Sequence, residues 1–337
     1  AVRSNDNSKN TVTGTKDIEV ATAQGNAYGI DAVKDSTNNV NKGVTTGLGS
    51  LTVNSNTGNA YGVNADVAGG EKTTYNYVGG LTKMDVTSID GDAAYGVNAT
   101  GGTSTTKNSL NDVHMTGDIT VTATLDWNES ASAYGVNADE YGSNTVEGSK
   151  NISATATVGD AYAVKASGTD AVNTINETAK SDKGSVTAIT DNGAAYAIAA
   201  TEGGTNTLGG VTSVEAKGTT GASGINANTN SVNTVAMNGN LTAKSTGTEG
   251  AYPVYAVNAH NSSTNNVTGT KNITATDTYG NAYGINATEG STNNVNKDVT
   301  KTMGDMTVSS DNGTAYGITA DAFSTTINTP TTNNVGG

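Results

Sequence analysis

One short motif returns ten times along the chain, and this repetition limits the folds that the sequence can adopt. The motif has the form Ala-Tyr-Gly-Val-Asn-Ala. Its central position is occupied in turn by Tyr28, Tyr61, Tyr95, Tyr134, Tyr162, Tyr196, Ser223, Tyr255, Tyr283 and Tyr316. The centres lie roughly 30 residues apart, which is the period of one structural repeat. The sequence therefore predicts a single continuous repeat array over residues 1–337 instead of a globular domain.

Each repeat contains three short segments with the period-2 alternation of β-strands. An apolar-polar alternation such as Ile119-Thr120-Val121 precedes a Gly/Asn/Asp turn, the tyrosine motif follows, and a third segment has the form Asn-x-Val, as in residues 38–40. None of the three shows helical periodicity, and all are enriched in β-branched residues. We therefore expect an all-β protein, a parallel β-helix (β-solenoid) of about ten coils with three short strands per coil.

Alternation within the motif predicts which way its side chains face. Tyr61, Val63 and Ala65 fall on one face, and the polar residue between the last two, Asn64, falls on the other. If the valines are in the core, the tyrosines point inward and stack coil on coil. The tyrosines concerned are Tyr28, Tyr61, Tyr95, Tyr134, Tyr162, Tyr196, Tyr283 and Tyr316. The alternative, an exposed tyrosine row, would push the valines into solvent under the same alternation.

The repeat with Ser223 in place of tyrosine breaks this series. Because a serine leaves space beside its neighbours, we expect its coil to be locally loose or filled by Tyr252 or Tyr255 from the following repeat.

A second regularity lies in the third segment, where an asparagine stands two positions before the apolar residue. The positions are Asn10, Asn38, Asn76, Asn144, Asn173, Asn206, Asn233, Asn265, Asn293 and Asn333. Alternation places these amides on the inward face, where an unpaired amide is costly. Amides stacked at the strand spacing of about 4.8 Å satisfy one another, which predicts an internal asparagine ladder at a bend. The alternative is that asparagine supplies turn conformations.

Composition agrees with a solenoid and limits the partners. The chain has 43 Gly, 2 Pro, no Cys and only 34% hydrophobic residues, too few for a conventional core but enough for a narrow one. A net charge of −14 makes nucleic acid and anionic membranes poor partners. No apolar run is long enough for membrane insertion. The lack of cysteine excludes disulfides and suits a long secreted chain.

The longest interval between motifs, from Tyr95 to Tyr134, contains the only tryptophan, Trp127. Insertions in solenoids form surface loops that often bind partners. Trp127 is therefore a candidate contact residue, although a lone surface tryptophan is more often incidental.

Catalytic chemistry has little support in the sequence. Acidic residues are scattered over turns, and His114 and His260 lie in different repeats without ligands at metal spacing. The Asp-Asn-Gly sequences at 191–193 and 311–313 offer oxygen ligands for calcium, but they are more typical of turns. Outward threonines such as Thr120 and Thr122 could form an ice-binding array, but the array is broken in other repeats. We predict no catalytic residues, no metal site and no cofactor.

Repeats such as Asn281-Ala282-Tyr283-Gly284-Ile285-Asn286-Ala287, followed by residues 291–295, resemble the passenger region of bacterial autotransporters and related β-helical surface adhesins. The resemblance covers essentially the whole chain. It implies a parallel β-helix exposed at the outer surface of a Gram-negative cell and working in adhesion or self-association. The chain shows neither the signal segment nor the membrane barrel of that family, so we expect a mature or excised piece.

The function expected is that of a non-enzymatic extracellular structural or adhesive protein on a bacterial cell surface. It would mediate self-association or attachment to a host or neighbouring cell, and its Ser and Thr could carry glycans. One alternative is a subunit of a head-to-tail extracellular filament, because the first and last repeats are nearly identical. Another, from a different class, is a β-helix polysaccharide-degrading enzyme, which would need paired carboxylates or a metal with a strong base.

Overall fold

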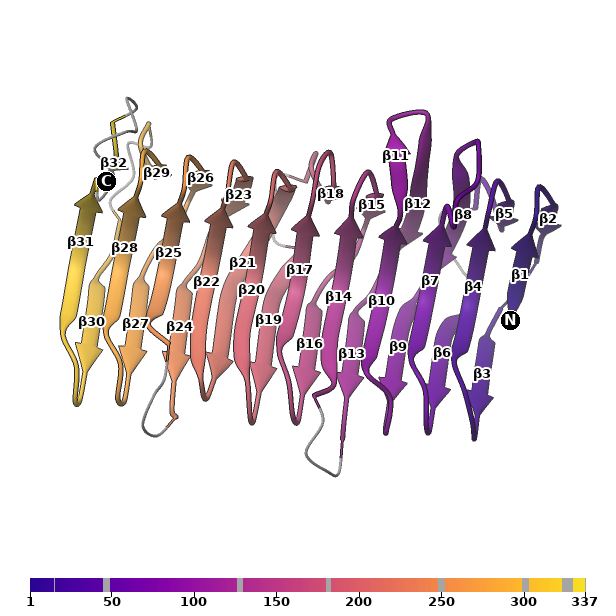
Figure 1. Cartoon of the computed structure of the whole chain (residues 1–337), viewed down its shortest axis with the longest axis horizontal. Coiled ribbons are helices and arrows are strands. Elements are labelled where there is room, and N and C mark those ends of the chain that lie inside the picture. Colours follow the sequence, from indigo (N-terminus) through magenta and orange to yellow (C-terminus); the bar gives the residue numbers. More distant parts are fainter. Residues whose placement is uncertain are drawn as a thin grey trace.

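A computed structural model describes residues 1–14, 16–44, 49–125, 130–179, 183–247, 252–298, 303–322 and 330–336. In these residues the chain winds into a parallel β-helix with three strands per coil, and it contains no helix (Figure 1). Except for β11, each strand pairs in parallel with the equivalent strand of the next coil. The predicted fold class is confirmed.

The motif segments form one eleven-stranded parallel sheet, called here the tyrosine sheet, which faces the viewer in Figure 1. Its strands, in spatial order, are β1 (Val2–Asn5), β4 (Ala27–Val33), β7 (Ala60–Asp66), β10 (Ala93–Thr100), β14 (Ser132–Asp139), β17 (Ala161–Ser167), β20 (Ala194–Thr201), β22 (Gly221–Asn228), β25 (Val254–His260), β28 (Ala282–Thr288) and β31 (Ala315–Asp321). Equivalent residues stack, as Tyr28 does on Tyr61. Strand β1 was not predicted from the motif, yet Val2 is in register with Ile30.

The first segment of each repeat forms the opposite wall of the solenoid. Its strands are β3 (Ile18–Thr22), β6 (Ser50–Ser55), β9 (Lys83–Ser88), β13 (Ile119–Ala123), β16 (Ile152–Ala156), β19 (Gly184–Thr190), the last part of β21 (Thr205–Gly218), β24 (Leu241–Ser245), β27 (Ile273–Asp277) and β30 (Met306–Ser310).

The asparagine segments form the third ladder. It contains β2 (Lys9–Val12), β5 (Thr37–Val40), β8 (Thr74–Leu81), β12 (Lys107–Met115), β15 (Ser143–Glu147), β18 (Val172–Ile175), the first part of β21, β23 (Val232–Met237), β26 (Thr264–Thr268), β29 (Thr292–Val295) and β32 (Thr332–Val335). Strand β11 (Gly102–Ser104) pairs with β12 antiparallel and makes a hairpin that projects from the stack (Figure 1).

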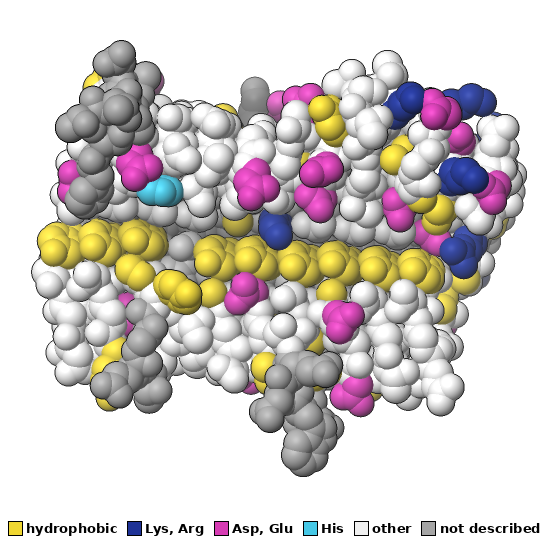
Figure 2. Space-filling view, viewed as in Figure 1, with side chains coloured by type: hydrophobic (Ala, Val, Ile, Leu, Met, Phe, Trp, Pro, Cys, Tyr) yellow, Lys and Arg dark blue, Asp and Glu magenta, His cyan; other side chains and the backbone are white. Residues whose placement is uncertain are grey.

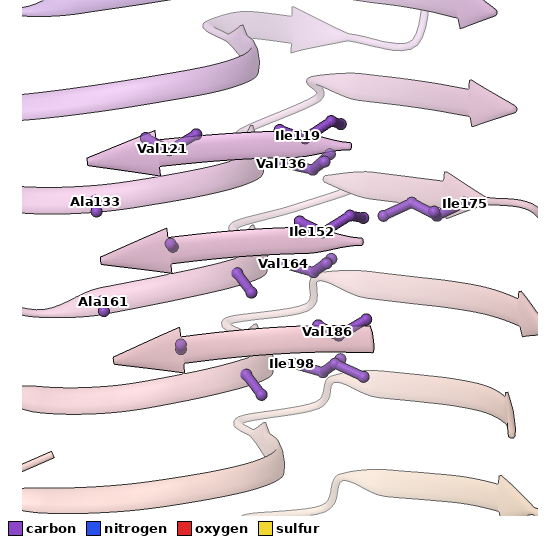
Figure 3. Packing of buried hydrophobic residues seen from close by; sticks show 14 of the residues in the cluster. Ile119, Val121, Ala133, Val136, Ile152, Ala161, Val164, Ile175, Val186 and Ile198 are labelled. Carbon is purple, nitrogen blue, oxygen red and sulfur yellow. The ribbon is translucent and has the colours of Figure 1, made fainter. Parts of the chain in front are cut away.

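The core is a narrow apolar column between the opposite wall and the tyrosine sheet. In the opposite wall two alternating positions point inward, and Ile119 and Val121 are both fully buried there. Val136 and Val164 of the tyrosine sheet and Ile175 of the asparagine ladder close the column (Figure 3). Because every coil contributes the same few apolar side chains, the low hydrophobic content is sufficient.

An uninterrupted ladder of asparagine amides lies inside the bend between the tyrosine sheet and the third ladder. Asn144 donates one Nδ2 proton to Asn173 Oδ1 at 2.9 Å and the other to the backbone carbonyl of Asn137 at 2.6 Å. The same pattern joins Asn10, Asn38, Asn76, Asn111, Asn144, Asn173, Asn206, Asn233, Asn265, Asn293 and Asn333. Asn111 was overlooked in the sequence, although it too stands two positions before an apolar residue, Val113. The amides therefore satisfy one another in the interior.

Replacement of Asn144 by alanine should lower the free energy of unfolding by about 1–3 kcal/mol, because it strands the amide proton of Asn111 and the amide oxygen of Asn173. The next residue, Thr145, faces outward and provides the control. Thr145→Val should change stability by no more than about 0.5 kcal/mol. Chemical denaturation of both variants tests the ladder. An equal loss of unfolding free energy in the two variants would argue against it.

Candidate functional site

The tyrosines of the motif form a row on the outer face of the tyrosine sheet. Figure 2 shows this row as a hydrophobic band that runs along the solenoid axis and is interrupted once. Neighbouring rings stack face to face, with centroids 4.7 to 5.2 Å apart and planes within 18° of parallel. The stacked pairs are Tyr28–Tyr61, Tyr61–Tyr95, Tyr95–Tyr134, Tyr134–Tyr162, Tyr162–Tyr196, Tyr255–Tyr283 and Tyr283–Tyr316.

The expectation that these tyrosines point inward is wrong, although they do stack coil on coil. The correction applies to Tyr28, Tyr61, Tyr95, Tyr134, Tyr162, Tyr196, Tyr283 and Tyr316. The glycine after each tyrosine faces the core instead: a Cβ on Gly96 would lie 2.9 Å from Ile119 Cγ2. Val97, the next residue, is also fully buried in the core. Two consecutive residues thus face inward, and strict alternation fails at this point of every motif.

This phase shift explains the small residue after each tyrosine. Where glycine is absent, alanine takes its place, and Ala163, Ala197 and Ala256 are fully buried in the core. A larger side chain would meet the apolar side chains of the opposite wall. The small residue thus allows the valine to remain inside while the tyrosine turns to the surface.

Stacking leaves the rings half-buried except for Tyr316, the last of the row, which is exposed; a ring inside the row has two covered faces and only its edge meets water. Burial raises the pKa of six phenols of the row above the ordinary value, to about 12 for Tyr255; the six are Tyr61, Tyr95, Tyr134, Tyr162, Tyr196 and Tyr255. At Tyr162 burial is again the main cause of the raised pKa. The neighbouring Asp160 carboxylate adds to the effect; its Oδ2 accepts a hydrogen bond from the Tyr162 hydroxyl group at 3.2 Å. At neutral pH the row therefore presents protonated hydroxyl groups that can donate hydrogen bonds.

A second amide ladder lies outside, beside the tyrosine row. Asn64 donates to Asp31 Oδ1, Asn98 to Asn64 and Asn137 to Asn98, at 2.8 to 2.9 Å. Their side chains point outward as expected, yet these four residues are at most 8% exposed. The equivalent positions further along the row line hollows that together make a shallow groove; they are Lys165, Ala199, Asn226, Asn258 and Asn286. A second run joins Asn226, Asn258, Asn286 and Thr319.

Lys165 and Ala199 separate the two runs of this outer ladder. The Lys165 ammonium lies over the rings of Tyr162 and Tyr134, 4.8 and 5.3 Å from their centroids. Burial lowers its pKa, while the Asp139 carboxylate opposes that shift. The amine thus replaces an amide in the groove floor with a cation held by the aromatic row.

Hollows along the groove place polar groups beside the tyrosine edges. One of about 310 Å³ is lined by Tyr255, Asn258, Asn286 and His260 among others. Another of about 330 Å³ lies around Lys165, with Tyr162 and Glu202 in its lining. The surface offers amides, hydroxyl groups and aromatic edges, which suits binding of a polar polymer more than proton transfer.

The single interruption of the row falls at Ser223, and it is not filled as expected. Tyr255 keeps its own place in register with Ser223 and Tyr283. Tyr252 is 72% exposed, far more than a stacked ring. The coil is not loose either, because Ile225 and Val257 continue the core in register.

The two histidines lie in different coils, each beside a polar neighbour. His114 Nε2 lies 3.0 Å from Asp112 Oδ1, and His260 Nδ1 lies 2.6 Å from Thr288 Oγ1. No group of three or more His, Cys, Asp or Glu that could hold a metal ion occurs in the described ranges. Trp127, the candidate contact residue, lies outside the described residues.

Searches against protein-family models, curated proteins and solved structures returned no match for this chain. In the part of the chain that the structure describes, no helix has the length and apolarity of a membrane span.

Substitutions at Gly96 test the facing of the motif. Gly96→Val should destabilise the protein by about 1–3 kcal/mol, because the added carbons crowd Ile119 and Val121. If Gly96 faced water, valine would be neutral or stabilising in a strand. Thr120→Val, on the outer face of β13, is the control and should leave the melting temperature nearly unchanged.

Alkaline pH should unfold the solenoid through its tyrosines. The folded state raises the pKa of the buried rings of the row, such as Tyr134, Tyr196 and Tyr255, above the unfolded value of about 10. The stabilisation by these rings is therefore complete below pH ~10 and is lost as the pH rises through about 12, the value of Tyr255. Denaturant midpoints measured across this pH window should fall. The tyrosinate absorbance should rise at a higher pH than it does for the unfolded chain. In the Tyr255→Phe variant the denaturant midpoint should fall less steeply with pH. Ionisation of all tyrosines near pH 10 with no loss of stability would contradict the stacked arrangement.

Proposed function

We propose that the chain is a non-enzymatic extracellular structural or adhesive protein, a β-solenoid of a bacterial surface that mediates attachment or self-association. The single observation that carries this proposal is the exposed row of stacked tyrosines along the axis (Figure 2). In this role the row and its amide groove form the contact surface.

The chemistry of the row supports a contact role. Tyrosine is enriched in protein interfaces, since it combines a large apolar ring with a polar hydroxyl group. Here the rings are already held in one orientation by their neighbours, so little side-chain freedom remains to be lost on binding. Repetition adds many equivalent weak contacts along one line, which favours avidity.

The groove floor argues for binding over catalysis. Its side chains are mainly amides, which donate and accept hydrogen bonds but do not transfer protons near neutral pH. A polysaccharide-degrading enzyme needs two carboxylates at a fixed separation across the scissile bond. A hydroxyl-rich polymer on a neighbouring cell fits the amides and phenols as a partner, and the resemblance to autotransporter passengers agrees with this role.

Bead assays test the proposal. Beads coated with the chain should aggregate with one another or attach to cells. The triple variant Tyr95→Ser, Tyr134→Ser, Tyr162→Ser should reduce this attachment at least about tenfold, since it removes three adjacent rings and the contacts they share. The matched control changes Thr120, Thr155 and Thr187 to serine on the outer face of the opposite wall.

Three results would count against the proposal: no attachment by the unchanged chain, equal attachment by the tyrosine variant, or release of sugar reducing ends from polysaccharides. Negative-stain images of the same protein address the filament alternative, because head-to-tail stacking would produce fibres whose length grows with concentration.

A further inference from the structure

The interruption at Ser223 leaves a slot in the tyrosine row. Ser223 is in register with Tyr196 on one side and Tyr255 on the other. Each of these rings has a stacked partner only on its far side, Tyr162 and Tyr283 respectively. The faces of Tyr196 and Tyr255 are therefore opposite each other, separated by one position that no described ring fills.

The width of the slot is set by the coils beneath it. The backbone keeps the strand spacing there, because Asn258 still donates to Asn226 at 2.8 Å and Ile225 remains fully buried. Two steps of about 4.8 Å separate Tyr196 from Tyr255, which makes roughly 10 Å between the rings. One flat ring midway would lie about 5 Å from each, the spacing found elsewhere in the row.

The slot is a hollow of about 240 Å³. Its lining comes from Tyr196, Ser223, Tyr252 and Tyr255, with Asn226 and Asn258 on the groove side. Tyr252 stands at its edge, largely exposed. By contrast, the outer face of Tyr28 is covered by the Arg3 guanidinium at 5.4 Å. Among the described residues no cation covers Tyr196 or Tyr255 in this way.

We propose that this slot binds one planar aromatic ring, a phenol of the tyrosine class, which completes the row. Both faces of the ring would stack, and its hydroxyl group would lie in line with those of Tyr196 and Tyr255. The flat, parallel walls favour an aromatic ring, which stacks on both of them with its π faces, over a pyranose, whose puckered ring presents axial C–H groups instead of a flat face. This binding does not depend on the proposed role in attachment, because it follows from the geometry of the row.

Ligand-observed NMR with the whole chain tests the proposal. The probes are p-cresol, as a free aromatic molecule, and N-acetyltyrosinamide, as a tyrosine side chain on a peptide backbone; methyl glucoside and cyclohexanol are the comparison compounds. The ring protons of both phenols should shift upfield on binding, as expected for a ring held between two aromatic faces. Binding of p-cresol alone would identify a free aromatic ligand, whereas binding of both admits a side chain from another protein.

Two substitutions change the slot in opposite directions. Ser223→Tyr fills it and should weaken phenol binding at least tenfold while raising the melting temperature. Tyr95→Ser removes one ring between Tyr61 and Tyr134 and should create a second slot, which doubles the number of phenols bound. Tyr196→Ala removes one wall and should weaken binding about 2- to 10-fold.

If the Ser223→Tyr variant does not fold, the Tyr95→Ser variant still decides, because it should bind a second phenol. Absence of phenol binding, equal binding by Ser223→Tyr, or preference for methyl glucoside would each overturn the proposal.

Discussion

At most stacked positions of the described strands a side chain has its own kind as a neighbour one strand spacing away, and the rest of the structure depends on that constraint. Parallel in-register pairing puts Asn on Asn, Val on Val and Tyr on Tyr. Only side chains that interact favourably with copies of themselves can be repeated without limit. Apolar side chains do so by packing, amides by donating to one another, and aromatic rings by stacking. Like charges cannot, which accounts for the scarcity of charged residues at the stacked positions.

Where a coil departs from the repeat, its outer surface carries a different functional group. Lys165 replaces an amide and is held over two rings of the row. Ser223 replaces a ring and leaves a slot between two others. Because the strand register continues beneath both substitutions, each changes the outer face without disturbing the core. A solenoid can therefore vary its contact surface one coil at a time.

The period of the motif and the polar-apolar alternation were enough to predict the fold, the three strands per coil and the inner ladder built from Asn144 and its equivalents. The facing of the tyrosines could not be predicted, because alternation alone gives no sign of the phase shift between Tyr95 and Val97. The glycine between them was the available signal: Gly96 is where the wall opposite leaves no room for a Cβ. The burial of Asn98 could not be predicted from alternation either, since it depends on the amides of the two neighbouring coils, Asn64 and Asn137, which are hydrogen-bonded to it.

The two amide ladders run in opposite directions along the axis. In the inner ladder each amide donates toward the C-terminal end, as Asn144 does to Asn173, whereas in the outer one Asn98 donates back to Asn64. Chains of hydrogen bonds polarise along their direction, so a single ladder would build up partial charge of opposite sign at the two ends of the stack. Two opposed ladders cancel part of this polarisation. Among the described residues the outer ladder has six such hydrogen bonds against ten in the inner ladder, so it offsets part of the dipole that added coils would otherwise build up.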